Sequence, residues 1–323
     1  MKIGYSLSSE EYGPLELVEQ ARAAERAGFA SLWISDHYHP WNDAQGQSPF
    51  VWNVIGAVAA VTERIPLTTA VTCPTLRIHP AVVAQATATS AAMLEGRFRF
   101  GVGSGEALNE AILGDVWPEA DVRLEMLEEA VELIRRLWTG EVVSHHGRHY
   151  TVEHARIYTL PEQPPPILVS GFGPKSTDLA ARIGDGFATT SPSELVERFR
   201  AAAGPGKPVE GGTKVCFHAD EAEARRIAHR KWPNGLLPGE LAQVLPTPEH
   251  FEQATELVTE EMVAEKVPCG PDLDRHVESL RQYEEAGVDV LHVQQIGGDA
   301  GAFFEAYAAE VLPRFETAGA GAA

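Results

Sequence analysis

The sequence predicts an α/β fold, a (β/α)₈ TIM barrel with insertions. Short apolar segments alternate with longer segments of helical spacing along almost the whole chain. Polar residues and glycines gather directly after several of the apolar segments, at the edge where such barrels carry their functional residues. The 323 residues contain no linker or internal repeat, so we expect a single domain over residues 1–323. An open, doubly wound sheet is the structural alternative, because the same alternation also builds that fold.

The first half of the chain supplies four predicted strands, each a short apolar run that ends at polar residues or glycine. These strands are residues 3–7, 32–35, 67–72 and 97–102. Apolar residues at helical spacing predict helices at 15–27, at 50–62, from 80 onward and at 122–138. Gly28 ends the first helix, and Pro80 stands at an early helical position, where its missing N–H removes no hydrogen bond.

The second half supplies the other four strands and two long excursions. The strands are residues 167–170, 186–189, 214–217 and 290–294, and helices are predicted from 174, from 192 and at 301–315. The segment from about residue 140 to about residue 165 has the pattern of a hairpin followed by a proline-rich run. Residues of about 218–289 are mostly helical in pattern and are interrupted by prolines. We expect both excursions to lie outside the eight-stranded barrel.

Charge and cysteine content exclude several partners. With 26 basic and 46 acidic residues, the formal net charge is -20, so no basic stripe is available for nucleic acid. No apolar run is long enough to cross a bilayer, so we expect no membrane partner. Cys73, Cys216 and Cys269 form no CxxC motif, and the N-terminal residues lack a signal-peptide pattern. We therefore expect a cytoplasmic protein.

The second strand ends in a cluster of polar and aromatic side chains. Asp36 and His37 follow the apolar run at once, and Trp41 comes four residues later. An acid, an imidazole and an indole at the end of a barrel strand are typical of a proton-transfer site with an aromatic wall. The alternative is structural: Asp36 caps a turn, His37 is a surface histidine and Trp41 belongs to the core. No further ligand cluster accompanies them, so we expect no metal.

Two glycine-rich turns follow other strands. Residues 101–109 contain Gly101, Gly103 and Gly105, but the third glycine comes one residue too early for a dinucleotide-binding fingerprint. These glycines can let a planar ligand lie against the backbone, and Glu106 is either an acid beside that ligand or a first-turn carboxylate favoured by the helix dipole. Residues 170–173 form a turn before a helix, which is either a phosphate seat or an ordinary tight connection.

With these residues placed, the chain resembles the luciferase-like (β/α)₈ flavin and deazaflavin oxidoreductases over nearly its full length. Within them it looks most like the glucose-6-phosphate dehydrogenases that use the 8-hydroxy-5-deazaflavin coenzyme F420. The matching stretches are residues 35–41, 69–75, 101–110 and 184–187. The stretch Gly-x-Gly-Glu-Ala-Leu-Asn-Glu together with Ser-Asp-His…Trp is fairly specific, whereas either one alone is weak.

The resemblance implies a role for each matching position. His37 corresponds to the general base, Trp41 to the indole beside the reacting centre, Glu106 to the acid that protonates the reduced cofactor, and Glu10 to an active-site carboxylate. The cofactor-binding positions that it implies are Asp36, Ala70, Val71, Cys73, Gly103, Ser104, Gly105, Asn109, Ser170, Gly171, Phe172 and Gly173. The family usually carries a cis peptide bond that is not followed by proline, which here would join Ala70 to Val71.

The function that follows is an F420-dependent dehydrogenase, which moves hydride from the hydroxyl-bearing carbon of an alcohol or sugar to the deazaflavin. We expect a small-molecule substrate and a homodimer. An FMN-dependent monooxygenase of the same fold and a flavin-binding barrel without catalysis are the alternatives. An acid–base set formed by His37 and Glu106 favours the dehydrogenase over the mere binder.

The substrate site departs from the relatives. Glucose-6-phosphate dehydrogenases of this family hold the sugar phosphate with basic side chains at three places, which here carry Ser193, Ala242 and Lys266. Loss of two charge-assisted partners weakens recognition of a phosphate, each such bond being worth roughly 1.5–3 kcal/mol. Arg230 or Lys231 could substitute. We therefore expect glucose-6-phosphate to be a poor substrate and a less charged alcohol to be preferred.

Overall fold

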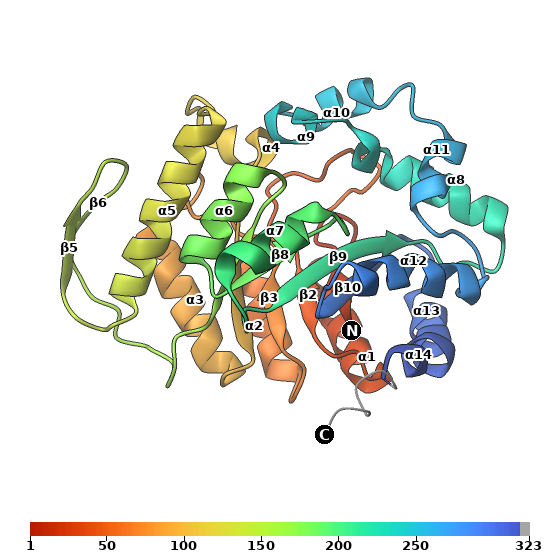
Figure 1. Cartoon of the computed structure of the whole chain (residues 1–323), viewed down its shortest axis with the longest axis horizontal. Coiled ribbons are helices and arrows are strands. Elements are labelled where there is room, and N and C mark those ends of the chain that lie inside the picture. The colour runs from red at the N-terminus through yellow and green to blue at the C-terminus, as the bar shows by residue number, and fades with distance from the viewer. Residues whose placement is uncertain (317–323) are drawn as a thin grey trace.

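The computed structural model describes residues 1–316 and contains a closed barrel of eight parallel strands surrounded by helices (Figure 1). The strands follow one another around the barrel in the order β1-β10-β9-β8-β7-β4-β3-β2. Strand β1 pairs with β2 on one side and with β10 on the other, which closes the cylinder. The predicted (β/α)₈ barrel is confirmed, and the open-sheet alternative is wrong.

The barrel strands are short, as expected for strands buried on both faces. They are β1 (Lys2–Leu7), β2 (Leu32–Ile34), β3 (Leu67–Thr69), β4 (Phe98–Val102), β7 (Ile167–Ser170), β8 (Gly186–Thr189), β9 (Val209–Val215) and β10 (Val290–Gln295). The helices around them are α1 (Pro14–Ala27), α2 (Val51–Val61), α3 (Pro80–Leu94), α5 (Ala120–Leu137), α6 (Pro174–Ile183), α7 (Glu194–Ala203), α12 (Leu273–Glu285) and α13 (Ala300–Ala306).

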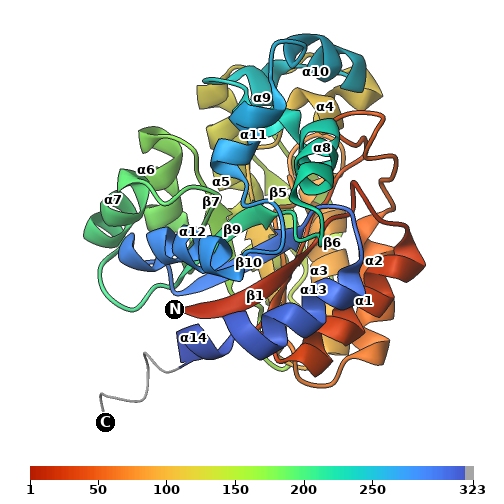
Figure 2. The same ribbon diagram turned by 90° about the vertical axis from the view of Figure 1, so that its right-hand side faces the viewer.

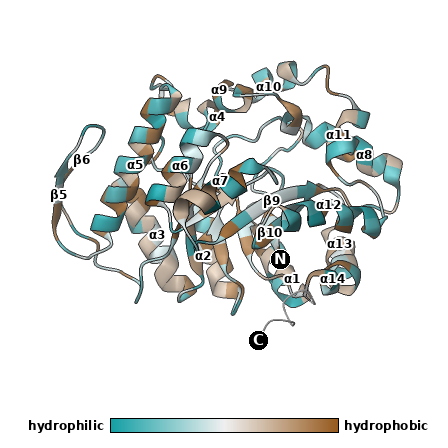
Figure 3. Cartoon of the chain, in the orientation of Figure 1, coloured by the Kyte–Doolittle hydropathy of each residue, from teal (hydrophilic) through white to brown (hydrophobic). Residues whose placement is uncertain are grey.

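The core lies between the outer faces of the strands and the inner faces of the helices. Outside β1, an aromatic cluster fills that layer: the Tyr5 ring lies 5.7 Å from Phe29 and 4.7 Å from Phe304. Helices α5 and α6 show hydrophilic and hydrophobic residues along the same length, as helices with one buried face do (Figure 3). This packing holds the strand ends in fixed positions, and therefore also the residues that follow them.

The prediction of the seventh strand at 214–217 is wrong, because β9 begins at Val209 and ends at Val215. Glu210 interrupts the apolar pattern, yet its carboxylate is fully buried and accepts hydrogen bonds from Trp33 Nε1 at 2.7 Å and Thr68 Oγ1 at 3.1 Å. At Gly212 a Cβ atom would lie 2.4 Å from the Trp33 ring, so only glycine fits beside that indole. The strand therefore contains residues that sequence patterns assign to loops.

Two other boundaries differ from the prediction. Strand β3 ends at Thr69, and only an isolated bridge joins Thr72 to Val102 beyond it. The last helix is interrupted: α13 is followed by a π-helical turn at Tyr307–Val311, and α14 (Pro313–Glu316) begins at a proline. Because Pro313 has no N–H to donate, the helical hydrogen-bond pattern cannot run through that position unchanged.

Both excursions lie outside the barrel. The first is the antiparallel hairpin of β5 (Val143–His146) and β6 (Thr151–Ala155), which projects at the left of Figure 1. The second contains α8 (Glu221–Lys231), a 3₁₀ turn (Pro233–Leu236), α9 (Leu241–Val244), α10 (Pro248–Ala254) and α11 (Glu260–Lys266). In both ribbon views this second group lies on the same side of the barrel as α4 (Ala107–Glu110), the short helix after β4 (Figures 1 and 2).

We call the open end formed by the carboxyl ends of the strands the barrel mouth. Since α4 follows the carboxyl end of β4, the second excursion lies over this mouth. Within residues 1–316, no helix has both the length and the apolar composition needed to cross a bilayer.

Candidate functional site

Three side chains from different strand ends meet around the His37 imidazole at the barrel mouth. Glu10 follows β1, His37 follows β2 and Glu106 stands at the start of α4, after β4. His37 Nε2 lies 3.4 Å from Glu10 Oε1 and 3.6 Å from Glu106 Oε1. The His37 side chain is 10% exposed and that of Glu106 is 23% exposed, so a small molecule can reach both from the mouth. The structure thus brings together three residues from stretches that the sequence placed around one barrel mouth.

The other ring nitrogen of His37 is held by the backbone. Nδ1 lies 3.1 Å from the carbonyl oxygen of His39. When Nδ1–H donates to that carbonyl, Nε2 carries a lone pair and can accept a proton. The imidazolium that results places its new N–H toward the carboxylates of Glu10 and Glu106, which stabilise the positive charge. This arrangement suits a general base.

Asn109, on α4, connects the His37 loop to Glu106. Its amide oxygen accepts from the backbone N–H of Tyr38 at 2.8 Å and of His39 at 3.0 Å. These two donors identify the amide oxygen, so the amide nitrogen donates to Glu106 Oε1 at 2.5 Å. It also lies 3.0 Å from His37 Nδ1, which accepts from it only when the imidazole proton is on Nε2 and not on Nδ1. Asn109 is buried, and in this structure it positions the base and the acid together. Its predicted contact with a cofactor remains a prediction.

Trp41 forms one wall beside the base. Its ring lies 5.0 Å from the His37 ring and 5.1 Å from Phe251, which α10 of the second excursion supplies. Both aromatic pairs are edge-to-face, a favourable geometry for such rings. The predicted neighbourhood of His37 and Trp41 is confirmed, and the excursion contributes directly to the surroundings of the base.

Asp36 lies in a buried ion-pair network that the sequence did not reveal. Arg77 Nη2 donates to Asp36 Oδ1 at 2.8 Å, and Thr72 Oγ1 donates to Asp36 Oδ2 at 2.8 Å. Arg77 Nε also lies 3.4 Å from Glu110 Oε1. Burial raises the pKa of Glu110 to about 7, while Arg77 opposes that shift. Both Asp36 oxygens therefore have protein partners, and its predicted cofactor contact remains a prediction.

The predicted cofactor positions from three strands lie side by side. The peptide bond between Ala70 and Val71 is cis, as the resemblance implies. A Cβ atom at Gly103 would lie 2.7 Å from Val71 Cγ2 and 3.7 Å from Ser170 Cβ, so these residues, which follow β3 and β4 and end β7, are immediate neighbours. Ala70 and Val71 pack on a small buried layer inside the barrel, formed by Trp33, Leu168 and Ala188.

Gly105 lies farther along the same glycine turn. Its φ of +75° is in the left-handed region, and a Cβ atom there would lie 2.6 Å from Cys73 Sγ. Cys73 is buried, whereas Ser104 and Gly105 are partly exposed. The glycines at 103 and 105 thus let the side chains of Val71 and Cys73 pack directly against this turn, beside the partly exposed Ser104.

The turn Ser170–Gly173 precedes α6, as predicted. The backbone N–H groups of Phe172 and Gly173 both donate to Ser176 Oγ at 3.2 Å. Phe172 is exposed, and Gly171 is buried against α6. A phosphate at this turn would exchange places with the Ser176 hydroxyl as the acceptor for these donors. That phosphate contact remains a prediction.

The two residues predicted to bind substrate have structural positions of their own. Ser193 is the N-cap of α7, and its Oγ accepts from Leu195 N at 3.4 Å. Lys266 is the last residue of α11 and is exposed. Among the described residues, neither side chain forms a hydrogen bond or ion pair with His37, Glu10 or Glu106. Their role in substrate binding remains a prediction.

Three further residues of the mouth lie on or beyond β9 and β10, and sequence reasoning missed them. Lys214 and Gln294 are register partners on these two strands, and Lys214 Nζ lies 4.2 Å from the centroid of the Trp232 ring. The buried carboxylate of Glu11 accepts from Trp232 Nε1 at 2.5 Å and from Gln294 Nε2 at 3.1 Å. A correct register for β9 would have identified Lys214 as an inward residue, whereas no sequence signal connects Glu11 to Trp232.

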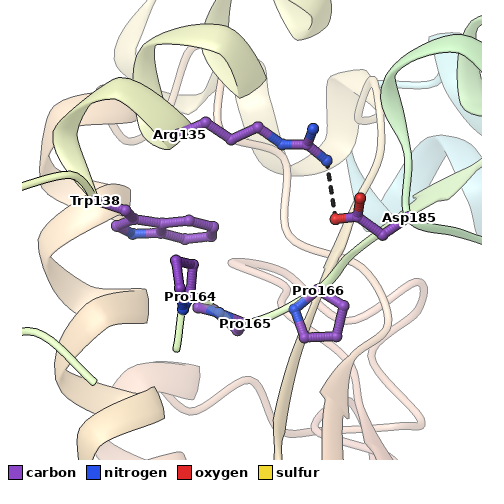
Figure 4. Close-up of a pocket in the computed structure, with 6 residues that line it drawn as sticks. All are labelled: Arg135, Trp138, Pro164, Pro165, Pro166 and Asp185. Carbon is purple, nitrogen blue, oxygen red and sulfur yellow. Dashed lines mark hydrogen bonds and ion pairs between the residues drawn. The ribbon is translucent and has the colours of Figure 1, made fainter. Parts of the chain in front are cut away.

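A separate hollow of about 420 Å³ lies on the outer wall of the barrel (Figure 4). It is lined by Arg135, Trp138, Pro164, Pro165, Pro166 and Asp185, and it contains none of the predicted site residues. Arg135 and Asp185 form an ion pair of 2.9 Å across it. Among residues 1–316, no group of three or more His, Cys, Asp or Glu side chains is arranged to hold a metal ion.

Comparison with known proteins gives the same picture over nearly the whole chain. F420-dependent glucose-6-phosphate dehydrogenases of Beutenbergia cavernae and Microbacterium testaceum are 39% and 38% identical to it, and each alignment covers 97% of both proteins. The solved structure of an F420-dependent secondary alcohol dehydrogenase with an F420-acetone adduct superposes with a TM-score of 0.90 at 31% identity, covering 97% of this chain and 98% of that one.

More distant structures share the fold. The coenzyme F420-dependent tetrahydromethanopterin reductase of Methanopyrus kandleri has a TM-score of 0.78 at 21% identity, covering 97% of this chain and 99% of that one. The family model described as luciferase-like monooxygenase matches residues 1–290. The family predicted from the sequence is therefore confirmed: the chain belongs to the luciferase-like monooxygenase family.

Proposed function

We propose that this protein is an F420-dependent dehydrogenase that oxidises the hydroxyl-bearing carbon of an alcohol or sugar. The observation that carries the proposal is the meeting of His37, Glu10 and Glu106 at the barrel mouth, with Nε2 of the base directed at two carboxylates. The functions of the relatives at 39% and 31% identity support the same cofactor and the same type of reaction. They do not favour the FMN-dependent monooxygenase or a barrel without catalysis.

The chemistry assigns one task to each side chain. When bound, F420 supplies a ring carbon that accepts hydride. His37 Nε2 takes the proton of the substrate hydroxyl, and Glu10 stabilises the imidazolium from 3.4 Å. Trp41 excludes water from one side of the base and limits the directions from which a substrate can approach. The carboxyl group of Glu106, at the end of the glycine turn, is placed to transfer a proton.

The residues present fit a deazaflavin. Gly103 and Gly105 let the side chains of Val71 and Cys73 pack directly against the turn, and together with the partly exposed Ser104 they form a surface of small groups. A flat ring system can lie along such a surface at van der Waals distance. Ala70 and Val71 would support one face of the ring, and the turn Ser170–Gly173 would hold the phosphate after the Ser176 hydroxyl is displaced.

Cofactor identity can be tested with purified protein and two ligands. We expect F420 to bind with micromolar affinity or tighter and to lose its visible absorbance when a substrate alcohol is added. FMN titrated in the same way is the comparison. Tight FMN binding with no F420 binding would refute the proposal, and F420 binding without reduction by any alcohol in a broad panel would leave only a binding protein.

We propose that glucose-6-phosphate is not the preferred substrate. Ser193 caps a helix and Ala242 has no charge, so two of the three expected phosphate partners are missing. Lys231, a possible substitute, pairs with Glu11 at 3.3 Å. Steady-state assays with glucose-6-phosphate, glucose and simple secondary alcohols test this point. A kcat/KM for the phosphate well above the values for uncharged alcohols would contradict it.

We also propose that the chain acts as a single-domain homodimer in the cytoplasm. Cys73, Cys216 and Cys269 are all free and buried, which is compatible with a reducing compartment. Light scattering at several protein concentrations tests the dimer. A mass of 35.0 kDa at every concentration would contradict it.

A further inference from the structure

We propose that Lys214 is a substrate-recognition residue and that the substrate carries a carboxylate in addition to its reacting hydroxyl. The inference rests on the proposed function and names the substrate class of the same site. On β9, Glu210 bonds to Trp33 inside the barrel, and a Cβ at Gly212 would point at the same indole. Because strand side chains alternate between faces, Lys214 is also directed inward, two positions nearer the mouth.

The ammonium group of Lys214 has an aromatic contact and free donors. Its Nζ lies 4.2 Å from the centroid of the Trp232 ring, within the range of a cation–π interaction. Within residues 1–316 the ammonium makes no hydrogen bond or ion pair with another side chain. An ammonium has three N–H donors, and a ring face satisfies them only weakly. Lys214 can therefore donate to a ligand without breaking an existing bond.

The Glu11 carboxylate does not neutralise Lys214, because four other donors surround its oxygens. Trp232 Nε1 donates to it at 2.5 Å, Gln294 Nε2 at 3.1 Å and Gly297 N at 3.0 Å. Lys231 Nζ lies 3.3 Å from the same carboxylate. Glu11 thus already has its own cation, and that cation is Lys231.

Both oxygens of the Glu10 carboxylate also have partners already. One of its oxygens accepts from Ser8 Oγ and Ser35 Oγ, both at 2.8 Å, and the other faces His37. Burial lowers the pKa of the Lys214 ammonium, and the Glu10 and Glu11 carboxylates oppose that shift. Trp232 contacts both the Lys214 ammonium and the Glu11 carboxylate. The neighbouring residue Glu10 contacts His37, so a molecule that reaches His37 can also place a group at Lys214.

Lys214 is a single cation, and the carboxylates of Glu10 and Glu11 beside it are already hydrogen-bonded. Such a site suits a ligand with one negative charge better than a ligand with two. A phosphate dianion would meet stronger repulsion from Glu10 and Glu11, and Ser193 offers it no charge. A neutral alcohol would leave the Lys214 donors without an acceptor. A carboxylate matches the ammonium in charge and accepts its hydrogen bonds, which are stronger than neutral ones. The chemistry therefore points to a hydroxy acid.

The test compares hydroxy acids with their amides in the wild type and in Lys214→Met. The probes are lactate, 3-hydroxybutyrate and 4-hydroxypentanoate, which place the carboxylate at three distances from the carbinol carbon, and the three corresponding amides. For the acid of the right length, we expect kcat/KM relative to its amide to fall at least tenfold in Lys214→Met and to be largely restored in Lys214→Arg. Lys2→Met, which removes an exposed charge at the start of β1, is the matched control.

Calorimetric titration of the same acids into the F420-loaded protein separates recognition from turnover. If F420 does not bind, the protein alone is titrated. Acid binding that disappears in Lys214→Met while no alcohol reduces F420 would support Lys214 and contradict the dehydrogenase. F420 reduction with equal acid-to-amide ratios in the wild type and Lys214→Met would overturn the inference alone. A wild type that prefers no acid over its amide would also overturn it, even if the variant failed to fold.

Discussion

The two sides of the barrel mouth differ in how firmly their polar side chains are held. On the side of β1, β2 and β4, Asn109 joins the His37 loop to Glu106, and Glu10 has partners for both oxygens. On the side of β8 and β9 and the second excursion, Lys214 lies over an indole and Lys266 is exposed. The first side fixes positions through mutual hydrogen bonds. On the second side, Lys214 and Lys266 have no ion-pair partner within residues 1–316, so we expect substrate preference to change there without disturbing the base.

The strongest test of this difference removes the base itself. We expect His37→Ala to lower turnover about 10²–10⁴-fold, the usual contribution of a general base, with little change in F420 affinity. Glu106→Gln should slow the same step. His146→Ala, in the exposed hairpin, is the control for loss of a histidine. Turnover like that of the wild type in both site variants would mean that another group removes the proton.

A second test uses pH to probe the buried network behind the base. Burial raises the pKa of Glu110 to about 7 from an ordinary value of 4.5. Between these values the folded protein binds more protons than the unfolded chain, so the stability from protonated Glu110 is lost as pH rises through this window. We expect the free energy of unfolding to fall by no more than about 3 kcal/mol for this group.

Urea unfolding at pH 5, 6, 7 and 8 measures that loss. Glu110→Gln keeps an oxygen that can accept from Arg77 N, which donates to Glu110 at 2.9 Å, but it cannot titrate. Its stability should therefore change less with pH than that of the wild type. Glu141→Gln, on the exposed connection before β5, is the control. Identical pH slopes for the wild type and Glu110→Gln would assign the titration to a different group.

A third test loosens the first side without replacing a reacting group. Asn109→Ala leaves the backbone N–H groups of Tyr38 and His39 without their acceptor. We expect a loss of about 1–3 kcal/mol in the free energy of unfolding, the usual cost of unsatisfied buried donors, together with slower turnover. Asn53→Ala, on the exposed face of α2, should change neither quantity. Unchanged stability and turnover in Asn109→Ala would contradict its positioning role.

The smallest expected effect comes from the second side. Ser193→Lys returns a cation to one of the expected phosphate positions, and we expect kcat/KM for glucose-6-phosphate relative to glucose to rise about tenfold. Ser144→Lys, in the hairpin, makes the same change away from the mouth. An effect on turnover of neutral alcohols as large as that on the phosphate would show that this position does not act on substrate charge alone.

How much of the site the sequence could predict follows from the geometry of the barrel. The three stretches that contain Glu10, His37 and Glu106 were predictable as neighbours, because the carboxyl ends of all eight strands meet at one mouth, whereas Glu10 itself was singled out only by the family resemblance. The pairing of Asp36 with Arg77 was not, since it depends on how two loops fold back over each other. Lys214 was missed because Glu210 and two glycines hide the beginning of β9. Glu210 and these glycines break the apolar pattern of a strand because the interior of the barrel requires them at these positions.

Glu11 has a consequence for how the protein assembles. Its partners Trp232, Gln294 and Gly297 are 221, 283 and 286 positions away along the sequence. A growing polypeptide therefore carries this buried acid without its donors until the final strand has been made and has docked beside β1. Long loops must close before these contacts form, which is typical of a slow, late step in folding. Completion of the catalytic end of the barrel is thereby linked to synthesis of nearly the entire chain.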